Sequence, residues 1–381
     1  MHRQPIWWHL LDVTLVSQVE QVFHVVRIGR KVAGAPVRSL NLKEHQLQQS
    51  MFFTDRPIET LTPEAVRWGP TRPEDLAQPP YTVTKPKLEG KTAGFFVRDA
   101  RGHQYLFKLD PPEAPELLTG AEVVTSKLLS ALGYHVPSYE IVRAHRRDFR
   151  PDPAAAGRAR ALSAEALQTL LTQHERGGEI RLAASKLLDG EILGPMRFKQ
   201  FRDCTEIRGL RLAYAWVNNT DSKDHNTLMV WDGTRAVGYL IDFGTSFGAD
   251  AGTGGPKNPC AGWTYAVDLP LAVRELTSLG RYRSGCDLTE TPVNAQVGRF
   301  SPRFNPAGWR PYAPNLAFAE MNDDDADWLA RRLARLSRAQ IDAAVSAGQY
   351  ASQKDRTYLL ETLEARRAAI LARYLEEEEE P

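Results

Sequence analysis

The sequence predicts an α+β protein with two lobes: a small β-rich lobe that contains one helix, and a larger lobe that is mostly helical. Three observations predict this class. Two β-rich runs separated by a turn occupy residues 94–109, helix signals dominate beyond residue 190, and a polar segment at residues 218–244 interrupts the helical half. With 381 residues, of which 42% are hydrophobic, the chain is long enough to bury a core in both lobes.

The composition excludes several classes of function. Lys and Arg total 48 and Asp and Glu total 47, so the formal net charge of +1 gives no reason to expect nucleic acid or an anionic membrane as a partner. No run of about 18 apolar residues occurs, so we expect no membrane-spanning helix. The three cysteines are far apart, which argues against a zinc ribbon or a disulfide framework, and none of the nine histidines forms a recognisable ligand pair.

Residues 1–80 are predicted to form an N-terminal extension whose role the sequence does not assign. A possible strand lies at residues 22–27, and a stretch punctuated by prolines ends at Pro79-Pro80. Near the N-terminus, Asp12 interrupts the apolar run and no small-residue cleavage site follows cleanly, so there is no clear signal peptide. A cytoplasmic location is the default expectation.

The small lobe is predicted at residues 81–190. Residues 94–99 and 104–109 flank a glycine-containing turn and are expected to form a β-hairpin. Apolar residues at helical spacing then predict a helix, with Thr119 as its N-cap and Gly133 as its C-terminal cap.

Two further strands of the small lobe are expected at residues 135–142 and 181–188. The stretch between them begins with an Arg-rich insertion near residues 143–160. Its arginines are interspersed with prolines and alanines, so we expect a surface loop.

The helical lobe is predicted at residues 191–375. A helix over residues 207–217 should lead directly into the polar segment. Residues 323–347 and 354–375 are predicted as two helices, because both stretches are rich in Ala, Leu and Arg. Residues 376–381 include five consecutive glutamates and are expected to form a solvated acidic tail.

The polar segment contains the residue types that phosphoryl transfer from ATP requires. Asp221, Lys223 and Asn226 are followed, after 15 intervening residues, by Asp242-Phe243-Gly244. This chemistry consists mostly of positioning and charge neutralisation. One carboxylate must receive or orient the proton of the nucleophile, while an Asn and a second Asp hold the metal ions.

A hairpin is expected between the two halves of the polar segment. Residues 227–231 and 236–241 are β-rich and flank Asp232-Gly233, a strong two-residue turn signal. Asn226 and Asp242 should therefore lie close together at the open end of the hairpin. The competing interpretation is a polar turn followed by an unrelated strand end, but the order, the spacing and the hairpin are jointly improbable by chance.

This segment resembles the catalytic loop and metal-binding motif of the protein-kinase-like superfamily, whose common form is Asp-x-Lys-x-x-Asn, a hairpin and Asp-Phe-Gly. The resemblance implies a two-lobed protein-kinase-like fold with ATP between the lobes. It also implies that Asp221 is the catalytic base and that Lys223 neutralises charge on the transferred phosphoryl group. Asn226 and Asp242 would bind Mg²⁺, with Mn²⁺ as a substitute.

The catalytic loop departs from that of ordinary protein kinases. Asn219-Thr220 stands where those enzymes have His-Arg, and no Ala-Pro-Glu follows the Asp-Phe-Gly motif. The Thr-Asp-x-x-x-x-Asn form is more similar to the HipA-type kinases and, more distantly, to the phosphatidylinositol kinases. Residues 119–122 and 216–221 also resemble a group of uncharacterised bacterial kinase-like proteins.

The resemblance places a phosphate-binding lysine on a strand of the small lobe, and Lys108 has this position. Its carboxylate partner should lie on the next helix, where Glu122 is the first choice. A competing explanation stays open, because Thr119 and Glu122 have the spacing of a capping box, in which the carboxylate reaches back to the amide of Thr119. Glu116 and Glu113 are the alternative partners for Lys108.

A glycine-containing stretch lies where the phosphate-covering loop of a kinase-like lobe should be. Gly90 and Gly94 enclose Lys91 and Thr92, and the glycines can let backbone amides approach an anion. The stretch lacks the Gly-x-Gly-x-x-Gly pattern of ordinary protein kinases. We expect Gly90, Lys91, Thr92 and Gly94 to contribute to nucleotide binding.

Ser246 lies in a Gly-x-Ser-x-Gly match that superficially suggests a hydrolase nucleophile. The match lacks its required context, because Gly/Pro-rich sequence follows it and no histidine occurs after His225. We therefore reject the hydrolase interpretation.

The sequence thus favours an ATP-dependent phosphotransferase that transfers the γ-phosphoryl group to an unidentified acceptor. A protein Ser or Thr, a lipid headgroup and a small molecule are all open, because the same polar groups serve each of them. The alternative is a pseudokinase, a nucleotide-binding interaction module without catalysis. No nucleic-acid partner is expected.

Overall fold

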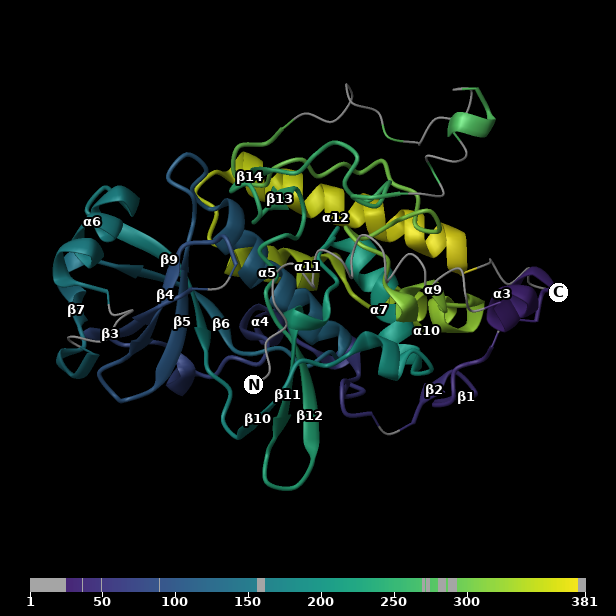
Figure 1. Cartoon of the computed structure of the whole chain (residues 1–381), viewed down its shortest axis with the longest axis horizontal. Helices are drawn as coiled ribbons and strands as arrows, with labels where there is room; N and C mark the ends of the chain where they lie inside the picture. Colours follow the sequence, from purple (N-terminus) through teal and green to yellow (C-terminus); the bar gives the residue numbers. More distant parts are fainter. Residues whose placement is uncertain are drawn as a thin grey trace.

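The computed structural model describes residues 25–375, apart from residues 36, 49, 89, 156–161, 269, 270, 272–274, 280–285 and 287–292. A β-rich lobe lies beside a helical lobe, and helix α5 (Leu117–Leu132) lies between the large sheet and the C-terminal helices (Figure 1). The predicted two-lobed α+β class is confirmed. The acidic tail and residues 22–24 of the strand predicted at residues 22–27 lie outside the described residues. No helix in the described ranges is long and apolar enough to span a membrane.

The small lobe is built on one sheet, whose strands run in the order β6-β9-β5-β4-β3-β7, with β8 paired to β9. Its strands are β3 (Tyr81–Pro86), β4 (Gly94–Arg98), β5 (Gln104–Leu109), β6 (Tyr139–Ala144), β7 (Phe149–Pro151), β8 (Glu175–Arg176) and β9 (Glu179–Lys186). All neighbours are antiparallel except β3 and β7. The predicted hairpin is therefore confirmed as β4–β5, and the two later strands as β6 and β9.

The predicted Arg-rich surface loop is wrong in part. It contains the end of β6 and the short strand β7, which extends the sheet through a parallel pairing with β3. Phe149 of β7 is buried against Tyr81 and Phe95, so this stretch contributes to the core of the sheet. Helix α6 (Ala164–His174) packs on the same core through Leu167 and Leu171.

Helix α5 is the central element of the molecule, and all sixteen of its residues are buried. Its first turn is capped by Asp110 at the end of β5, whose carboxylate accepts hydrogen bonds from the amides of Leu118 and Thr119, both at 2.8 Å. Thr119 is therefore inside the helix, and the predicted N-cap is wrong. Gly133 does end the helix, with φ 113°, and a Cβ there would lie 2.4 Å from the ring of Phe53.

Beyond residue 190, the helical lobe includes α7 (Thr205–Trp216), α9 (Leu316–Ala319), α10 (Asp323–Ala334), α11 (Arg338–Ala347) and α12 (Gln353–Tyr374). The single helix predicted at residues 323–347 is wrong, because α10 ends at Ala334. Ser337 then caps α11 in a capping box with Gln340. Helix α12 confirms the last predicted helix.

The expected hairpin forms from β11 (Thr227–Trp231) and β12 (Ala236–Leu240), and β10 (Glu191–Gly194) adds a third strand. This sheet projects below the helices in Figure 1. The remaining short strands are β1 (Leu42–Lys43), β2 (Gln46–Leu47), β13 (Ala249–Asp250) and β14 (Gly255–Pro256).

Residues before the sheet pack against both lobes. Helix α3 (Val25–Val32) occupies the place where a strand was predicted, so that prediction is wrong for residues 25–27. Helix α4 (Pro63–Trp68) packs against α5 and α11. Between these helices, Phe52, Phe53 and Ile58 are buried in the main hydrophobic core.

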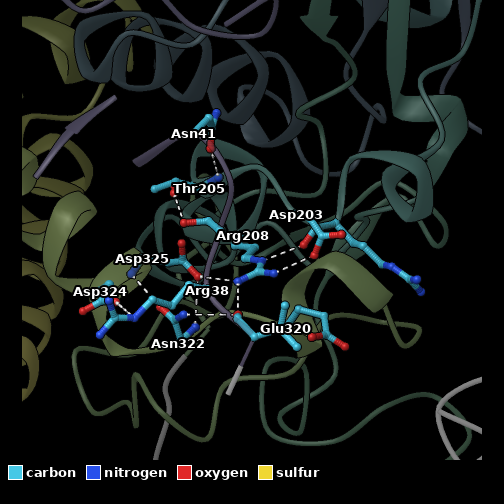
Figure 2. A network of polar contacts seen from close by, with 12 residues as sticks. Arg38, Asn41, Asp203, Thr205, Arg208, Glu320, Asn322, Asp324 and Asp325 are labelled. Carbon is cyan, nitrogen blue, oxygen red and sulfur yellow. Dashed lines mark hydrogen bonds and ion pairs between the residues drawn. The ribbon is translucent and has the colours of Figure 1, made fainter. Parts of the chain in front are cut away.

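A polar network fastens this N-terminal region to the helical lobe (Figure 2). At its centre, the fully buried Arg208 of α7 bonds Asp203 at 2.8 Å, Asp325 at 3.2 Å and the carbonyl of Val37 at 2.8 Å. Asn41 accepts a hydrogen bond from the amide of Thr205 at 2.9 Å. Backbone and side chains from three distant parts of the sequence thus satisfy one buried guanidinium.

Candidate active site

The polar segment starts where α7 ends. Asn218 has φ 50°, in the left-handed region that Asn tolerates better than most residues, and it turns the chain out of the helix. Both ends of its side-chain amide are hydrogen-bonded: Oδ1 accepts from Trp309 Nε1 at 3.0 Å, and Nδ2 donates to the carbonyl of Phe247 at 3.1 Å. The loop is thereby attached to the chain that follows Gly244.

Within the loop, the three predicted catalytic-loop residues contact one another. The Nζ atom of Lys223 lies 2.7 Å from Oδ2 of Asp221, and both side chains are partly exposed. Asn226 Nδ2 donates to the backbone carbonyl of Asp221 at 2.9 Å. This bond leaves Asn226 Oδ1 as the atom of that amide able to bind a cation.

The hairpin brings the second half of the segment back to the first. The amide of Ile241 donates to the carbonyl of Asn226 at 3.0 Å, so Asp242 directly follows the residue that pairs with Asn226. Asp242 itself has φ 63°. Non-glycine residues in this region carry a backbone cost of about 1 kcal/mol, and such conformations cluster at functional sites.

Lys108 bridges the small lobe and the Asp-Phe-Gly motif. Its Nζ atom lies 2.7 Å from Glu122 Oε1 and 3.0 Å from Asp242 Oδ1. The Lys108 and Glu122 side chains are only 7% and 1% exposed, whereas Asp242 is 40% exposed. The pair is therefore enclosed on the helix side, and the Asp242 carboxylate faces open space.

The structure also decides between the two explanations for Glu122. Because α5 begins at Leu117 and Asp110 caps it, Glu122 lies in the second turn and its carboxylate binds Lys108. The alternative partner Glu116 instead accepts from the amide of Ala351, at 3.1 Å. Glu113 is exposed. The capping-box explanation is wrong.

Lys108, Glu122 and Asp242 lie close enough to shift one another's pKa values. Burial alone would lower the pKa of Lys108, but the carboxylates of Asp242 and Glu122 outweigh it and raise the pKa. Burial raises the pKa of Glu122 although Lys108 opposes the shift. For Asp242, burial is outweighed by Lys108, so its pKa is lowered and the group is ionised at neutral pH. The ionised carboxylate of Asp242 is partly exposed, and an oxygen ligand of this kind suits a divalent cation.

The glycine-containing stretch follows β3 and leads into β4. Gly90 has φ 71°. Gly94 is the register partner of Lys108, and a Cβ there would lie 2.4 Å from the carbonyl of Phe107, so strand packing explains this glycine. Lys91 is exposed and Thr92 is partly buried at the turn.

Two lysines near the site were missed by sequence reasoning. Lys87 donates to the carbonyl of Thr92 at 3.1 Å and helps to lower the pKa of Asp242. Lys257 is buried, and its Nζ donates to the carbonyls of Asn218, Thr245 and Phe247. Lys87 could have been identified from its position just before the glycine-containing stretch. No sequence motif around Lys257 indicates its role.

The segment after Gly244 shows no hydrolase geometry. Ser246 is fully buried, and its hydroxyl has no partner among the described residues. Further along, Cys260 and Cys286 form a disulfide. The cysteine spacing argued against a disulfide framework, and that expectation is wrong for this pair. Its separation of 26 residues in the sequence matches no recognisable motif.

The residues present fit a metal bound together with a nucleotide. No group of three or more His, Cys, Asp or Glu that could hold a metal occurs in the described ranges. Mg²⁺ in nucleotide sites needs fewer protein ligands, because phosphates and water supply the rest. The exposed, ionised Asp242 and the unshared oxygen of Asn226 meet that requirement.

No protein-family model matches the chain, and no curated protein sequence matches it. Among solved structures, the chain is similar to a proinflammatory kinase of Helicobacter pylori, CtkA, at 11% identity and a TM-score of 0.38, covering 77% of this chain and 98% of that chain. It is also similar to a Golgi casein kinase at 11% identity and a TM-score of 0.32, covering 79% and 77%. A structure of the Golgi casein kinase with Mn and ADP bound gives 10% identity and a TM-score of 0.30, covering 79% and 76%. Identity and TM-score are low, so we derive the function of this chain from its own residues.

Proposed function

We propose that the chain is an ATP-dependent phosphotransferase of the atypical kinase class. The observation that carries the proposal is the position of Lys108, whose ammonium joins Glu122 of α5 to the aspartate of the Asp-Phe-Gly motif. The Lys108–Glu122 pair corresponds to the lysine–glutamate ion pair that phosphoryl transfer in protein kinases requires. Within that class, we propose that the chain is most similar to the HipA-type kinases, because Thr220, Asp221 and Asn226 have the Thr-Asp-x-x-x-x-Asn spacing.

Each residue has a role in the proposed reaction. Lys108 binds the α and β phosphates, and residues 90–94 cover them. Asp221 accepts the proton of the acceptor hydroxyl as its oxygen forms a bond to the γ phosphorus and the bond from that phosphorus to the β–γ bridging oxygen breaks, releasing ADP. Lys223 balances charge on the transferred group. Bound Mg²⁺ would neutralise phosphate charge, held by Asn226 and Asp242.

The acceptor is a hydroxyl of a protein, a lipid headgroup or a small molecule. Asp221 serves each of them equally, because it interacts only with the reacting hydroxyl. The competing proposal is a nucleotide-binding module without transfer. It requires that ATP bind and that no γ-phosphoryl group leave.

Exchange of Asp221 for Asn tests the proposal. With γ-labelled ATP, Mg²⁺ and a mixed pool of cell proteins, lipids and metabolites, the wild-type protein should label itself or one component. Asp221→Asn should label about 100-fold more slowly, because the proton acceptor is lost while the shape is kept. ATP binding, measured by calorimetry, should change little. Binding without labelling by the wild type would support the module, and equal labelling by both proteins would exclude Asp221 as the base.

Lys87 is expected to strengthen nucleotide binding. Its proximity to Asp242 and to the turn at Thr92 places a second ammonium where phosphate charge would lie. Lys87→Ala should raise the dissociation constant for ATP about tenfold, the effect of one charged hydrogen bond. Lys85→Ala is the matched control, since Lys85 lies over the ring of Phe96 at 4.4 Å. Equal affinities of the two variants would contradict the assignment.

A further inference from the structure

A basic pocket lies in the helical lobe, next to the start of the catalytic loop. It is bounded by the segment of residues 258–263, by residues 299–309 and by α12, and it encloses about 390 Å³ when the solvent at its mouth is included. Its polar lining includes Ser301, three arginines and three asparagines: Arg299, Arg303, Arg366, Asn218, Asn258 and Asn305. None of the described residues that line it is acidic.

Arg366 is the deepest cation of this pocket. It is buried, with its guanidinium carbon 3.9 Å from the ring centroid of Phe304 and 4.9 Å from that of Phe300. Its nitrogens donate to three backbone carbonyls, those of Trp216, Ser301 and Ala215. A guanidinium has five N–H donors, so these bonds leave two without a partner among the described residues.

Burial lowers the pKa of Arg366, and no described carboxylate opposes that shift. The other deeply buried arginines behave differently. Arg208 contacts Asp203 and Asp325, and Arg332 contacts Asp55. A buried charge is costly unless it is paired, so the missing counter-charge at Arg366 points to a partner outside the described chain.

The mouth of the pocket is accessible. Asn258, Arg303 and Asn305 are all exposed, while Asn218 and Arg366 form the buried end. A small anion can therefore enter from solvent and meet guanidinium and amide donors on its way in.

The pocket is also connected to the proposed catalytic loop. Asn218 lines it and is held by Trp309 Nε1 at 3.0 Å. Arg299 donates to the carbonyl of Lys257 at 3.2 Å, and Lys257 in turn donates to the carbonyls of Asn218 and Thr245. An anion bound here would contact the same residues that hold the catalytic loop to the segment after the Asp-Phe-Gly motif.

We propose that this pocket binds a phosphate group, distinct from the phosphates of the proposed nucleotide, and that the bound group fixes residues 258–263 against the catalytic loop. Guanidinium forks match the geometry of phosphate oxygens and give its strongest charged hydrogen bonds in proteins. The source is inorganic phosphate or a phosphorylated side chain, which offer the same oxygens.

Binding of inorganic phosphate tests the proposal. Calorimetry and thermal unfolding of the full chain are compared in sodium phosphate and in sodium chloride of equal ionic strength, without nucleotide. We expect saturable binding and a higher unfolding temperature in phosphate. Arg303→Gln, at the exposed mouth, should weaken binding about tenfold, because it removes one charged contact without altering the buried core.

Two further variants locate the binding. Arg235→Gln changes another exposed arginine, at the turn of the β11–β12 hairpin, and should bind phosphate like the wild type. Lys108→Met disrupts the proposed nucleotide site and should also bind like the wild type. Absence of binding, equal affinity of Arg303→Gln and wild type, or loss of binding only in Lys108→Met would each overturn the proposal, and none of these results depends on kinase activity.

N-acetylphosphoserine amide distinguishes the two sources. If it competes with inorganic phosphate and the unphosphorylated amide does not, the pocket accepts a phosphorylated side chain. If only inorganic phosphate binds, the ligand is the free ion. Both results support a phosphate site, provided that Arg303→Gln weakens the binding.

Discussion

Replacing Asp242 with Asn should slow phosphoryl transfer about 1,000-fold, the largest change in activity expected for a single residue of this chain. The substitution keeps the size of the side chain but removes a carboxylate that Lys108 keeps ionised. A metal ion bound at an active site supplies several kcal/mol of charge stabilisation, and losing its charged ligand forfeits much of it. Steady-state labelling over a range of Mg²⁺ concentrations measures the effect.

The Asp242 variant should also respond to metal in a specific way. If the carboxylate binds Mg²⁺, excess Mg²⁺ or Mn²⁺ should recover part of the rate. Asp250→Asn provides the control, because Asp250 lies in the same segment and its carboxylate accepts hydrogen bonds from Gly252 and Thr253 of the local turn. An Asp242→Asn protein with normal rates would remove the metal assignment, and with it the main support for catalysis.

The fold around this site was predictable where the signals were local. The β4–β5 and β11–β12 hairpins each follow from two β-rich runs and a turn, and both formed as expected. The hairpin of β11 and β12 also explains why Asn226 and Asp242 come together, since their distance depends on only 15 intervening residues. Local sequence patterns were therefore enough to predict that Asn226 and Asp242 lie together.

The Lys108 partner was less predictable because two local patterns coincided. Thr119 and Glu122 have capping-box spacing, and only the distant residue Asp110, which takes over the helix cap, frees Glu122 for Lys108. A capping residue that lies outside the helix, as Asp110 does, is not found by searching for the usual spacing of capping residues. Sequence alone therefore could not choose between the roles.

Features that depend on long-range packing could not be predicted. Lys257 and Arg366 bond backbone carbonyls of α7 and the loops around it, and Arg366 is 150 residues from the carbonyl of Trp216 that it contacts. The strand prediction that is wrong at residues 25–27 has the same cause, since α3 is fixed through Arg27, which contacts Asp203 and Glu320. Tertiary contacts override weak local preference in such segments.

Arg208→Met should produce the largest loss of stability, a fall of about 3 to 5 kcal/mol in the free energy of unfolding. Methionine fills much of the space, but Asp325, whose side chain is fully buried, loses its guanidinium partner. The carbonyls of Val37 and Arg202 each lose a donor as well, although Asn322 Nδ2 stays within 3.5 Å of the Val37 carbonyl. Urea unfolding at pH 8 measures the change, and Arg331→Met, which removes an exposed pair with Asp327 in α10, should cost less than about 1 kcal/mol.

The pH dependence of this loss identifies its cause. Burial already raises the pKa of Asp325 in the wild type although Arg208 opposes it, so without Arg208 the folded-state pKa should rise further. A carboxylate whose pKa is higher in the folded than in the unfolded state costs stability in full above its folded pKa. The cost shrinks as pH falls below that value and vanishes below the unfolded pKa. The difference between Arg208→Met and wild type should therefore shrink from pH 8 to pH 5. A difference that stays constant over this range would mean that lost packing and lost carbonyl bonds, rather than an unpaired Asp325, destabilise the variant.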